Sequence, residues 1–204
     1  MRDIIIGVFA IVILCGFGVG SKSLKNLHNE SRFEVVTKEE RISEQIVAIK
    51  SMLKSNPKFN NEIVFLLDMK IMSGKNRFFV YDLIHDKIID QGLVAHGLGS
   101  GMFSELKFSD ENNSHCTSLG KYYIGKSYFG EFGKAYKLHG LEATNNNAFL
   151  RNIVLHKYNK VPYEEQKTYI CNSLGCPMVN EIYYSRIQKF IDNSKSNIIL
   201  DIYY

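Results

Sequence analysis

The chain lacks several features that mark other classes of protein. Its 204 residues carry a formal net charge of only +4, and the basic residues are scattered rather than gathered in one stripe. A basic stripe is the usual footprint of nucleic-acid binding, so no nucleic-acid partner is expected. The chain has no internal repeat and no low-complexity tract. Its 45% hydrophobic content suits one globular core, and no second domain is required.

Cysteine is scarce, and no CxxC or HxxxH spacing occurs. His115, Cys116, Cys171 and Cys176 are residue types that bind zinc, but without such spacing we expect no metal site and no cofactor. If the N-terminal segment is removed, three cysteines remain, and an odd count leaves at least one thiol free in an oxidising compartment. A Cys116–Cys171 disulfide stays open as an alternative, as does Cys171–Cys176.

A long apolar run occurs at the N-terminus, where residues 4–19 follow Arg2 and precede Gly20. This pattern is typical of a signal peptide or a short membrane anchor. The run falls short of the roughly 20 residues that span a bilayer, which favours cleavage over retention. We therefore expect residues 1–20 to direct export, residues 21–37 to be a polar linker and residues 38–204 to form the folded domain.

The remaining chain predicts a mostly β domain with peripheral helices. A helix is expected to begin after Thr37, with Glu40 completing its cap, and to end at Asn56-Pro57. A second helix is expected at 181–193. Strands are indicated where β-branched, aromatic and apolar residues lie between Gly, Asn and Asp: 62–69, 77–83, 87–95, 135–141, 152–156 and 197–203.

One segment pair carries a chemical signal. The β-prone run Val154-Leu155 ends at His156. After sixteen intervening residues, Ser173-Leu174-Gly175-Cys176-Pro177 predicts a turn around a cysteine. A catalytic thiol needs a nearby base, and imidazole is the usual one. Glycine directly before the nucleophile lets backbone N–H groups approach a developing oxyanion. The pattern favours acyl transfer, with Cys176 as nucleophile, His156 as base and Ser173 and Gly175 shaping the turn.

A literal phosphate-binding loop pattern also occurs, at Gly120 to Ser127. A working loop of this kind follows a buried strand and opens a helix. Ser114-His115-Cys116 precedes the pattern and an aromatic, glycine-rich stretch follows it, so neither flank fits. We do not expect nucleotide binding.

With these residues in place, the chain resembles the murein L,D-transpeptidases, marked by a histidine, a spacer of this length and Ser/Thr-x-Gly-Cys. The resemblance extends over roughly residues 38–204 and is closest to the branch with Ser-x-Gly-Cys-Pro. Supporting matches are Leu93 to Gly97, Thr117 to Gly120, Tyr128, Gly130, Gly133, Leu138, Gly140 to Glu142, Asn145, Asn147, Ala148 and Arg151; departures are Asn172, Leu174, His139, Phe149 and Lys157.

The resemblance implies an L,D-transpeptidase-like β-sandwich or barrel and four candidate substrate-binding residues. Arg151 would hold a carboxylate of either the protein or the substrate. His96 would donate to a backbone carbonyl at a strand end or line the cleft. His139 would be a strand residue near the substrate groove, and Asn147 belongs to the matched segment before His156.

The implied activity is cysteine-dependent acyl transfer on peptidoglycan stem peptides, which releases D-Ala and forms 3→3 cross-links. A carboxypeptidase that trims tetrapeptides, a catalytically silent wall-binding module and a thiol hydrolase acting on another peptide remain alternatives. The expected location is the bacterial periplasm or cell envelope, with membrane attachment through residues 4–19 if they are retained, and the expected state is a monomer.

Overall fold

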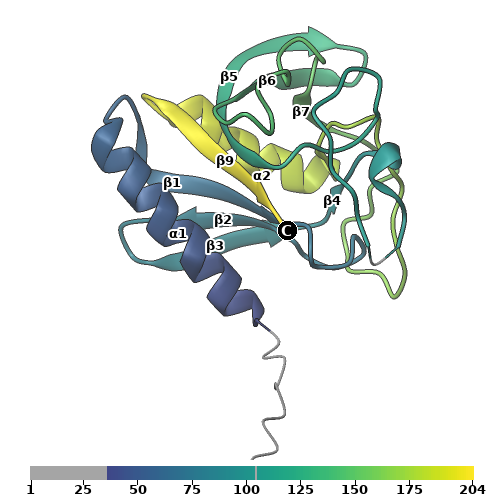
Figure 1. The fold of residues 1–204 in the computed structure, drawn as a ribbon, viewed down its shortest axis with the longest axis horizontal. Coiled ribbons are helices and arrows are strands. Elements are labelled where there is room, and N and C mark those ends of the chain that lie inside the picture. The colour runs from purple at the N-terminus through teal and green to yellow at the C-terminus, as the bar shows by residue number, and fades with distance from the viewer. Residues whose placement is uncertain (1–35, 104) are drawn as a thin grey trace, which may run out of the picture. The chain divides into compact units, whose positions relative to one another are not determined.

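The computed structural model describes residues 36–103 and 105–204, so the predicted export segment and nearly all of the linker lie outside the described residues. The two helices of this part are α1 (Lys38–Ser55) and α2 (Glu181–Asn193), and a 3-10 turn, η1, spans Leu98–Ser100 (Figure 1). The strands are β1 (Phe59–Asp68), β2 (Phe78–Asp82), β3 (Lys87–Gly92), β4 (Val94–Ala95), β5 (Gly120–Gly130), β6 (Gly133–Gly140), β7 (Val154–Lys157), β8 (Met178–Val179) and β9 (Asn197–Tyr203).

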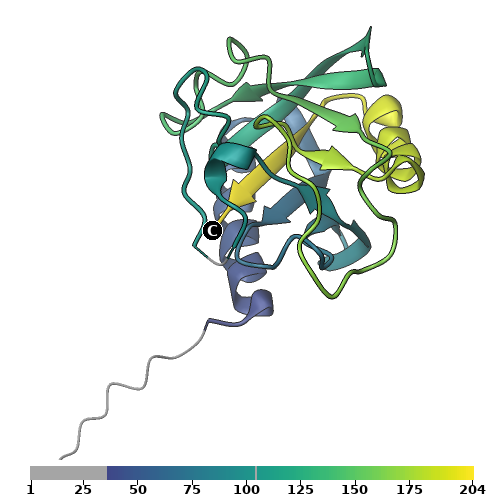
Figure 2. The ribbon, with the colours of Figure 1, turned by 90° about the vertical axis from the view of Figure 1, so that its right-hand side faces the viewer.

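The strands form one nine-stranded sheet in the order β3-β2-β1-β9-β5-β6-β7-β8-β4. Strands β3 and β4 stand at opposite ends of this order, yet only Leu93 separates them along the chain. The sheet therefore curls, so that its two ends adjoin at Leu93. Figure 2 shows the ribbon of this domain from the side. This closure confirms the mostly β, barrel-like class with peripheral helices that the sequence predicted.

The second half of strand β1, residues 64–67, is buried on both faces, which explains its apolar run. Val64 and Leu66 pack against α1, whereas Phe65 and Leu67 face the main core. Successive side chains of a strand point to opposite faces, so a strand covered on both sides must be apolar throughout. The main core also contains Tyr183 and Ile187 of α2, and Tyr183 meets the Phe78 ring edge-on at 5.4 Å.

The helix boundaries agree with the sequence signals. The Thr37 hydroxyl accepts a hydrogen bond from the Glu40 N–H, and the Glu40 carboxylate accepts one from the Thr37 N–H, forming the predicted capping box. Asn180 caps α2 by accepting a hydrogen bond from the Ile182 N–H. Each helix buries one apolar stripe; in α1 the stripe is Ile42, Ile46, Ile49 and Leu53.

All six predicted strands are present, but the sequence missed β5 and the short β8. Gly120 to Ser127, the literal phosphate-loop pattern, is part of β5 and continues into a hairpin rather than a helix. The segment therefore has no helix N-terminus at which phosphates could bind. Cys116, Cys171 and Cys176 are free thiols, so neither open disulfide pairing is formed.

No helix in the described part of the chain is both long and apolar enough to cross a membrane.

Candidate active site

The turn before Cys176 is built by Ser173 and Gly175. The Gly175 N–H donates to the Ser173 Oγ at 3.0 Å, so Ser173 shapes the turn. Gly175 has φ +119°, a backbone conformation that side chains disfavour. A Cβ there would lie 3.0 Å from the Cys116 carbonyl oxygen and 3.1 Å from Ile153 Cδ1. Both the conformation and the close packing thus require glycine next to the nucleophile.

Two parallel strands bring Cys176 and His156 to one face. β7 pairs with β8 so that His156 lies opposite Met178. Because alternate residues of a strand share a face, Val154 and His156 point the same way on β7. Cys176 lies in the bend two residues before Met178 and lines the same cavity as Val154 and His156. The Val154 N–H donates to the Cys176 Sγ at 3.4 Å, which fixes the side of the turn on which the thiol lies.

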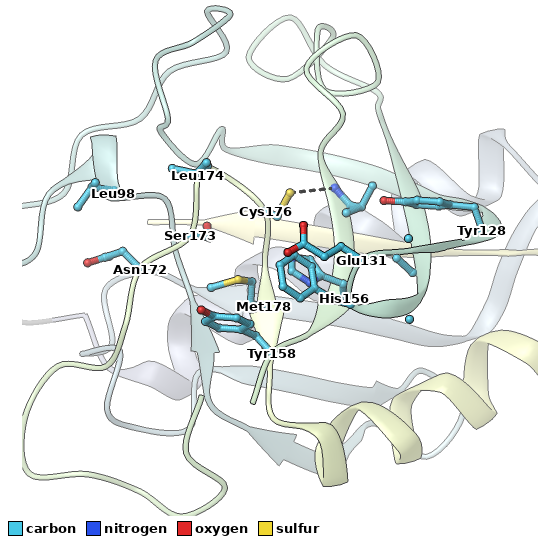
Figure 3. A pocket seen from close by; sticks show the side chains of 15 residues that line it. Leu98, Tyr128, Glu131, His156, Tyr158, Asn172, Ser173, Leu174, Cys176 and Met178 are labelled. Atoms are coloured by element: carbon cyan, nitrogen blue, oxygen red, sulfur yellow. Dashed lines mark hydrogen bonds between the residues drawn. The ribbon is translucent and has the colours of Figure 1, made fainter. Parts of the chain in front are cut away.

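A cavity of about 660 Å³ opens at this face and contains both groups (Figure 3). Apart from Cys176 and His156, its walls are largely apolar or aromatic. They are formed by Leu98, Tyr128, Gly130, Glu131, Phe132, Gly133, Ala135, Val154, Tyr158, Asn172, Ser173, Leu174 and Met178. The size suits a peptide-sized ligand held against the thiol.

The resting charges of the pair follow from burial. Burial raises the pKa of the Cys176 thiol above its ordinary value, although the Val154 N–H and the positive charges of Arg151 and Lys137 oppose the change. Burial also lowers the pKa of His156. At rest the site therefore favours a protonated thiol, which donates to the Asn152 carbonyl oxygen at 3.7 Å, and a neutral imidazole. The His156 Nδ1–H donates to the Lys157 carbonyl oxygen at 3.0 Å, which leaves Nε2 as the basic nitrogen.

This charge state predicts the pH dependence of the reaction. Only a neutral imidazole can take up a proton, so the lowered pKa of His156, the expected base, should preserve kcat/KM down to pH values below the ordinary imidazole range of about 6.5. The raised pKa of Cys176 should make alkylation by iodoacetamide still increase above the ordinary thiol range of about 8.5. Initial rates of both reactions across pH test this. Full alkylation rates already at pH 6 would instead indicate a thiolate–imidazolium pair.

The backbone supplies one candidate donor for an oxyanion. The Gly175 N–H, which the sequence analysis also considered, already donates to Ser173. Among the described residues, the Cys176 N–H donates no hydrogen bond. A tetrahedral oxyanion needs such donors aimed at the position where its charge develops. The Cys176 amide is therefore the donor that remains for a substrate carbonyl oxygen.

Arg151 lies beneath the nucleophile turn and is held by the protein itself. Its side chain is only 4% exposed and contacts the Asp110 carboxylate at 3.3 Å. It also donates to the Cys116 carbonyl oxygen at 2.7 Å and to that of Ser109 at 3.0 Å. The Asn147 N–H binds the same Asp110 carboxylate at 2.6 Å. Of the two alternatives for Arg151, the structure shows a carboxylate of the protein, and neither Arg151 nor Asn147 lines the cavity.

His96 is also a supporting residue rather than part of the cavity wall. It is 2% exposed, and its Nδ1 accepts a hydrogen bond from buried Arg77 at 2.8 Å while its Nε2–H donates to the Gly101 carbonyl oxygen at 2.7 Å. Burial and the Arg77 charge lower the pKa of His96 to about 4. The His96 carbonyl oxygen accepts from the Ser173 N–H at 2.8 Å, so this neutral imidazole fixes the strand end that holds the nucleophile turn.

His139 lies on β6, away from the cavity lining. Its ring is stacked between Tyr123, at 4.4 Å between ring centroids, and Phe149, at 4.7 Å. Gly125 faces the ring, because a Cβ there would lie 2.6 Å from His139 Nε2. None of the four residues expected to bind substrate therefore lines the cavity that holds Cys176 and His156.

The residues that do line the cavity include a hairpin tip that was not predicted from the sequence. Glu131 and Phe132 form the turn between β5 and β6, and the Phe132 ring stacks on His156 at 5.0 Å. Tyr158 meets Phe132 edge-on at 5.5 Å. The spacing of Tyr128, Gly130 and Gly133 was the available signal for this hairpin. Asn172 and Leu174, noted as departures from the family pattern, also line the cavity.

Comparisons with solved structures return distant likenesses. The helical cell shape determining protein Pgp2 from Campylobacter jejuni is 12% identical, with a TM-score of 0.46 over 74% of this chain and 52% of that chain. Bdellovibrio bacteriovorus Bd1075 is 17% identical, with a TM-score of 0.44 over 72% and 49%. An L,D-transpeptidase from Xylanimonas cellulosilytica is 12% identical, with a TM-score of 0.38 over 76% and 69%.

The alignment with the first two of these proteins thus spans about half of their length. No curated protein matches the chain. A family model described as the L,D-transpeptidase catalytic domain matches residues 35–200, which is most of the chain and includes both His156 and Cys176. The chain therefore belongs to the L,D-transpeptidase catalytic domain family.

Proposed function

We propose that this protein is a cysteine acyltransferase acting on peptidoglycan stem peptides, with formation of 3→3 cross-links. The observation that carries the proposal is the placement of Cys176 and His156 on one wall of one cavity, by adjacent segments of the family's catalytic domain. The donor would be a tetrapeptide stem. The bond broken would join the L-centre of its diamino acid to the terminal D-Ala.

The first half-reaction uses the neutral pair described above. His156 Nε2 takes the proton of the Cys176 thiol as sulfur attacks the carbonyl carbon, and the oxyanion receives the Cys176 N–H. The imidazolium then protonates the departing D-Ala amine, leaving a thioester on Cys176. Because burial disfavours both charges before attack, the proton moves as the substrate binds rather than beforehand.

The walls of the cavity favour transfer to an amine over hydrolysis. Phe132, Leu174 and Met178 present apolar surface around the thioester position, and Tyr158 extends it. A bound peptide acceptor would cover this surface, and water excluded from it cannot attack the thioester. Peptidoglycan lies outside the cytoplasmic membrane, so the proposal also requires the export expected from residues 4–19.

Mass spectrometry of tetrapeptide muropeptides incubated with the purified full-length protein tests the proposal. We expect an acyl-enzyme adduct on Cys176, loss of D-Ala and dimers linked 3→3, none of which should form with the Cys176→Ala variant. Tripeptide without dimers would identify a carboxypeptidase instead. Folded protein that gives neither product nor adduct would contradict an enzymatic role on this substrate and favour the silent wall-binding module.

A further inference from the structure

The cavity that holds the nucleophile carries a single acidic side chain. Among the described residues that line it, Glu131 is the only aspartate or glutamate, and the surrounding wall is mainly apolar and aromatic. Figure 3 shows the Glu131 carboxylate projecting over the cavity between Cys176 and His156. The first half-reaction as derived above gives this carboxylate no role.

The hairpin that carries Glu131 is anchored to the catalytic base. Glu131 and Phe132 are the turn residues between Gly130 and Gly133, and Gly133 has φ +84°, as in hairpin loops that end in a left-handed glycine. The Phe132 ring stacks on the His156 ring and meets Tyr158 edge-on. This packing fixes Phe132 against His156, and it therefore holds the neighbouring Glu131 at the edge of the cavity.

The carboxylate is also available to a ligand. Within the described part of the chain, no side chain or backbone N–H donates to Glu131, and it joins no ion pair. A second glutamate, Glu181, lines an adjoining pocket together with Glu131, but Glu181 forms an ion pair with Lys157. Lys157, the cation of that pocket, is therefore engaged by another carboxylate. An unpaired carboxylate above an apolar cavity is suited to a cationic ligand.

From these observations we propose that Glu131 binds the ammonium group of the acyl acceptor and accepts its first proton. The inference rests on the proposed function and assigns the acceptor to a chemical class: a primary amine that arrives protonated. A protonated amine has no lone pair and cannot attack a thioester, so the second half-reaction needs a base in addition to a binding site.

Each of the three ammonium protons of the acceptor has a defined destination in this step. The acceptor ammonium carries three nitrogen-bound protons. Glu131 takes one, and the free amine then attacks the thioester carbonyl of Cys176. As the new C–N bond forms and the C–S bond breaks, His156 takes a second proton from nitrogen and returns it to the departing sulfur. The third proton stays on the amide nitrogen, and Glu131 releases its proton to solvent.

The test follows the fate of the acyl-enzyme. Wild-type and Glu131→Gln proteins are acylated with a tetrapeptide donor, and decay of the adduct is followed by intact-protein mass spectrometry with three nucleophiles. These are water, a tripeptide stem with the free diamino acid amine, and hydroxylamine, which is uncharged at neutral pH. Glu62→Gln, a change of an exposed glutamate on β1 outside the cavity, is the matched control.

We expect Glu131→Gln to slow decay with the tripeptide amine about tenfold, the loss typical of a hydrogen bond to a charged group. Adduct formation, hydrolysis and decay with hydroxylamine should remain within twofold of wild type, and Glu62→Gln should change none of them.

Equal slowing with the amine and with hydroxylamine would overturn the inference, because a general distortion of the hairpin would then explain the loss. Unchanged decay with the tripeptide amine would overturn it directly. Failure of the wild-type protein to form any adduct is a separate result, which would overturn the proposed function and this inference together.

Discussion

Replacing Cys176 with alanine is expected to reduce D-Ala release and acyl-enzyme formation by about 10⁴-fold or more. The variant keeps the glycine turn, the His156 base and the cavity walls but loses the only thiol that lines the described cavity. Binding of the donor should survive, because the cavity contacts remain. Intact-protein mass spectrometry and release of free D-Ala measure the loss, and thermal unfolding shows whether the fold is kept.

Cys171→Ala is the matched control for this change. Cys171 is also a partly buried free thiol, but it packs with Ile170 and Val161 in a separate apolar cluster and does not line the cavity. Activity should stay near that of wild type. Retained turnover in the Cys176 variant, or its loss in the Cys171 variant, would contradict the assignment of the nucleophile.

Replacing Arg151 with methionine should have the largest effect on stability. The guanidinium is almost fully buried and contacts the Asp110 carboxylate together with the carbonyl oxygens of Ser109 and Cys116. Removing one partner of a buried ion pair leaves an uncompensated charge and costs about 3–5 kcal/mol of unfolding free energy. Denaturant unfolding, with the midpoint and slope both fitted, measures the loss.

Arg186→Met provides the comparison. Arg186 also pairs with a carboxylate, that of Asp90 at 2.7 Å, but its side chain is 33% exposed. An ion pair at such a site contributes about 1 kcal/mol or less, so the two arginine variants should differ clearly. Equal losses would show that Arg151 is not the buried support of the nucleophile turn.

The sequence predicted the fold well where patterns are local. Helix α1 was predicted from its capping box and from isoleucines at helical spacing. Strand β1 was predicted from its apolar run, which suits a strand buried on both faces. The turn before Cys176 was also predicted, because a glycine directly before a cysteine, with serine and proline on either side, is a turn sequence. Strand β5 was missed because its glycines and lysines depress strand propensity, while its pairing with β6 and β9 stabilises it.

The cavity walls could not be predicted in the same way. They come from the β5–β6 hairpin, from β7 and from the nucleophile segment, and only the pairing of distant strands brings these together. His96 was predicted to be a strand-end or cleft histidine, and Arg151 to hold a carboxylate of the protein or the substrate. Inside the protein, His96 is bound by Arg77 and Arg151 by Asp110. Spacing along the chain does not predict these partners.

The seam of the barrel at Leu93 has a consequence for how the protein matures. His96 follows β4, and its side chain contacts that of Asn172 in the segment before Cys176. These two residues are 76 positions apart in sequence. Contacts of such separation have a greater loop-closure entropy cost than local contacts, and folds that depend on them fold slowly. A partly folded chain would therefore contain Cys176 as an ordinary thiol, without the burial that raises its pKa. The base His156 and the cavity walls come together with Cys176 only when the distant strands pair, so acyl transfer requires the complete fold.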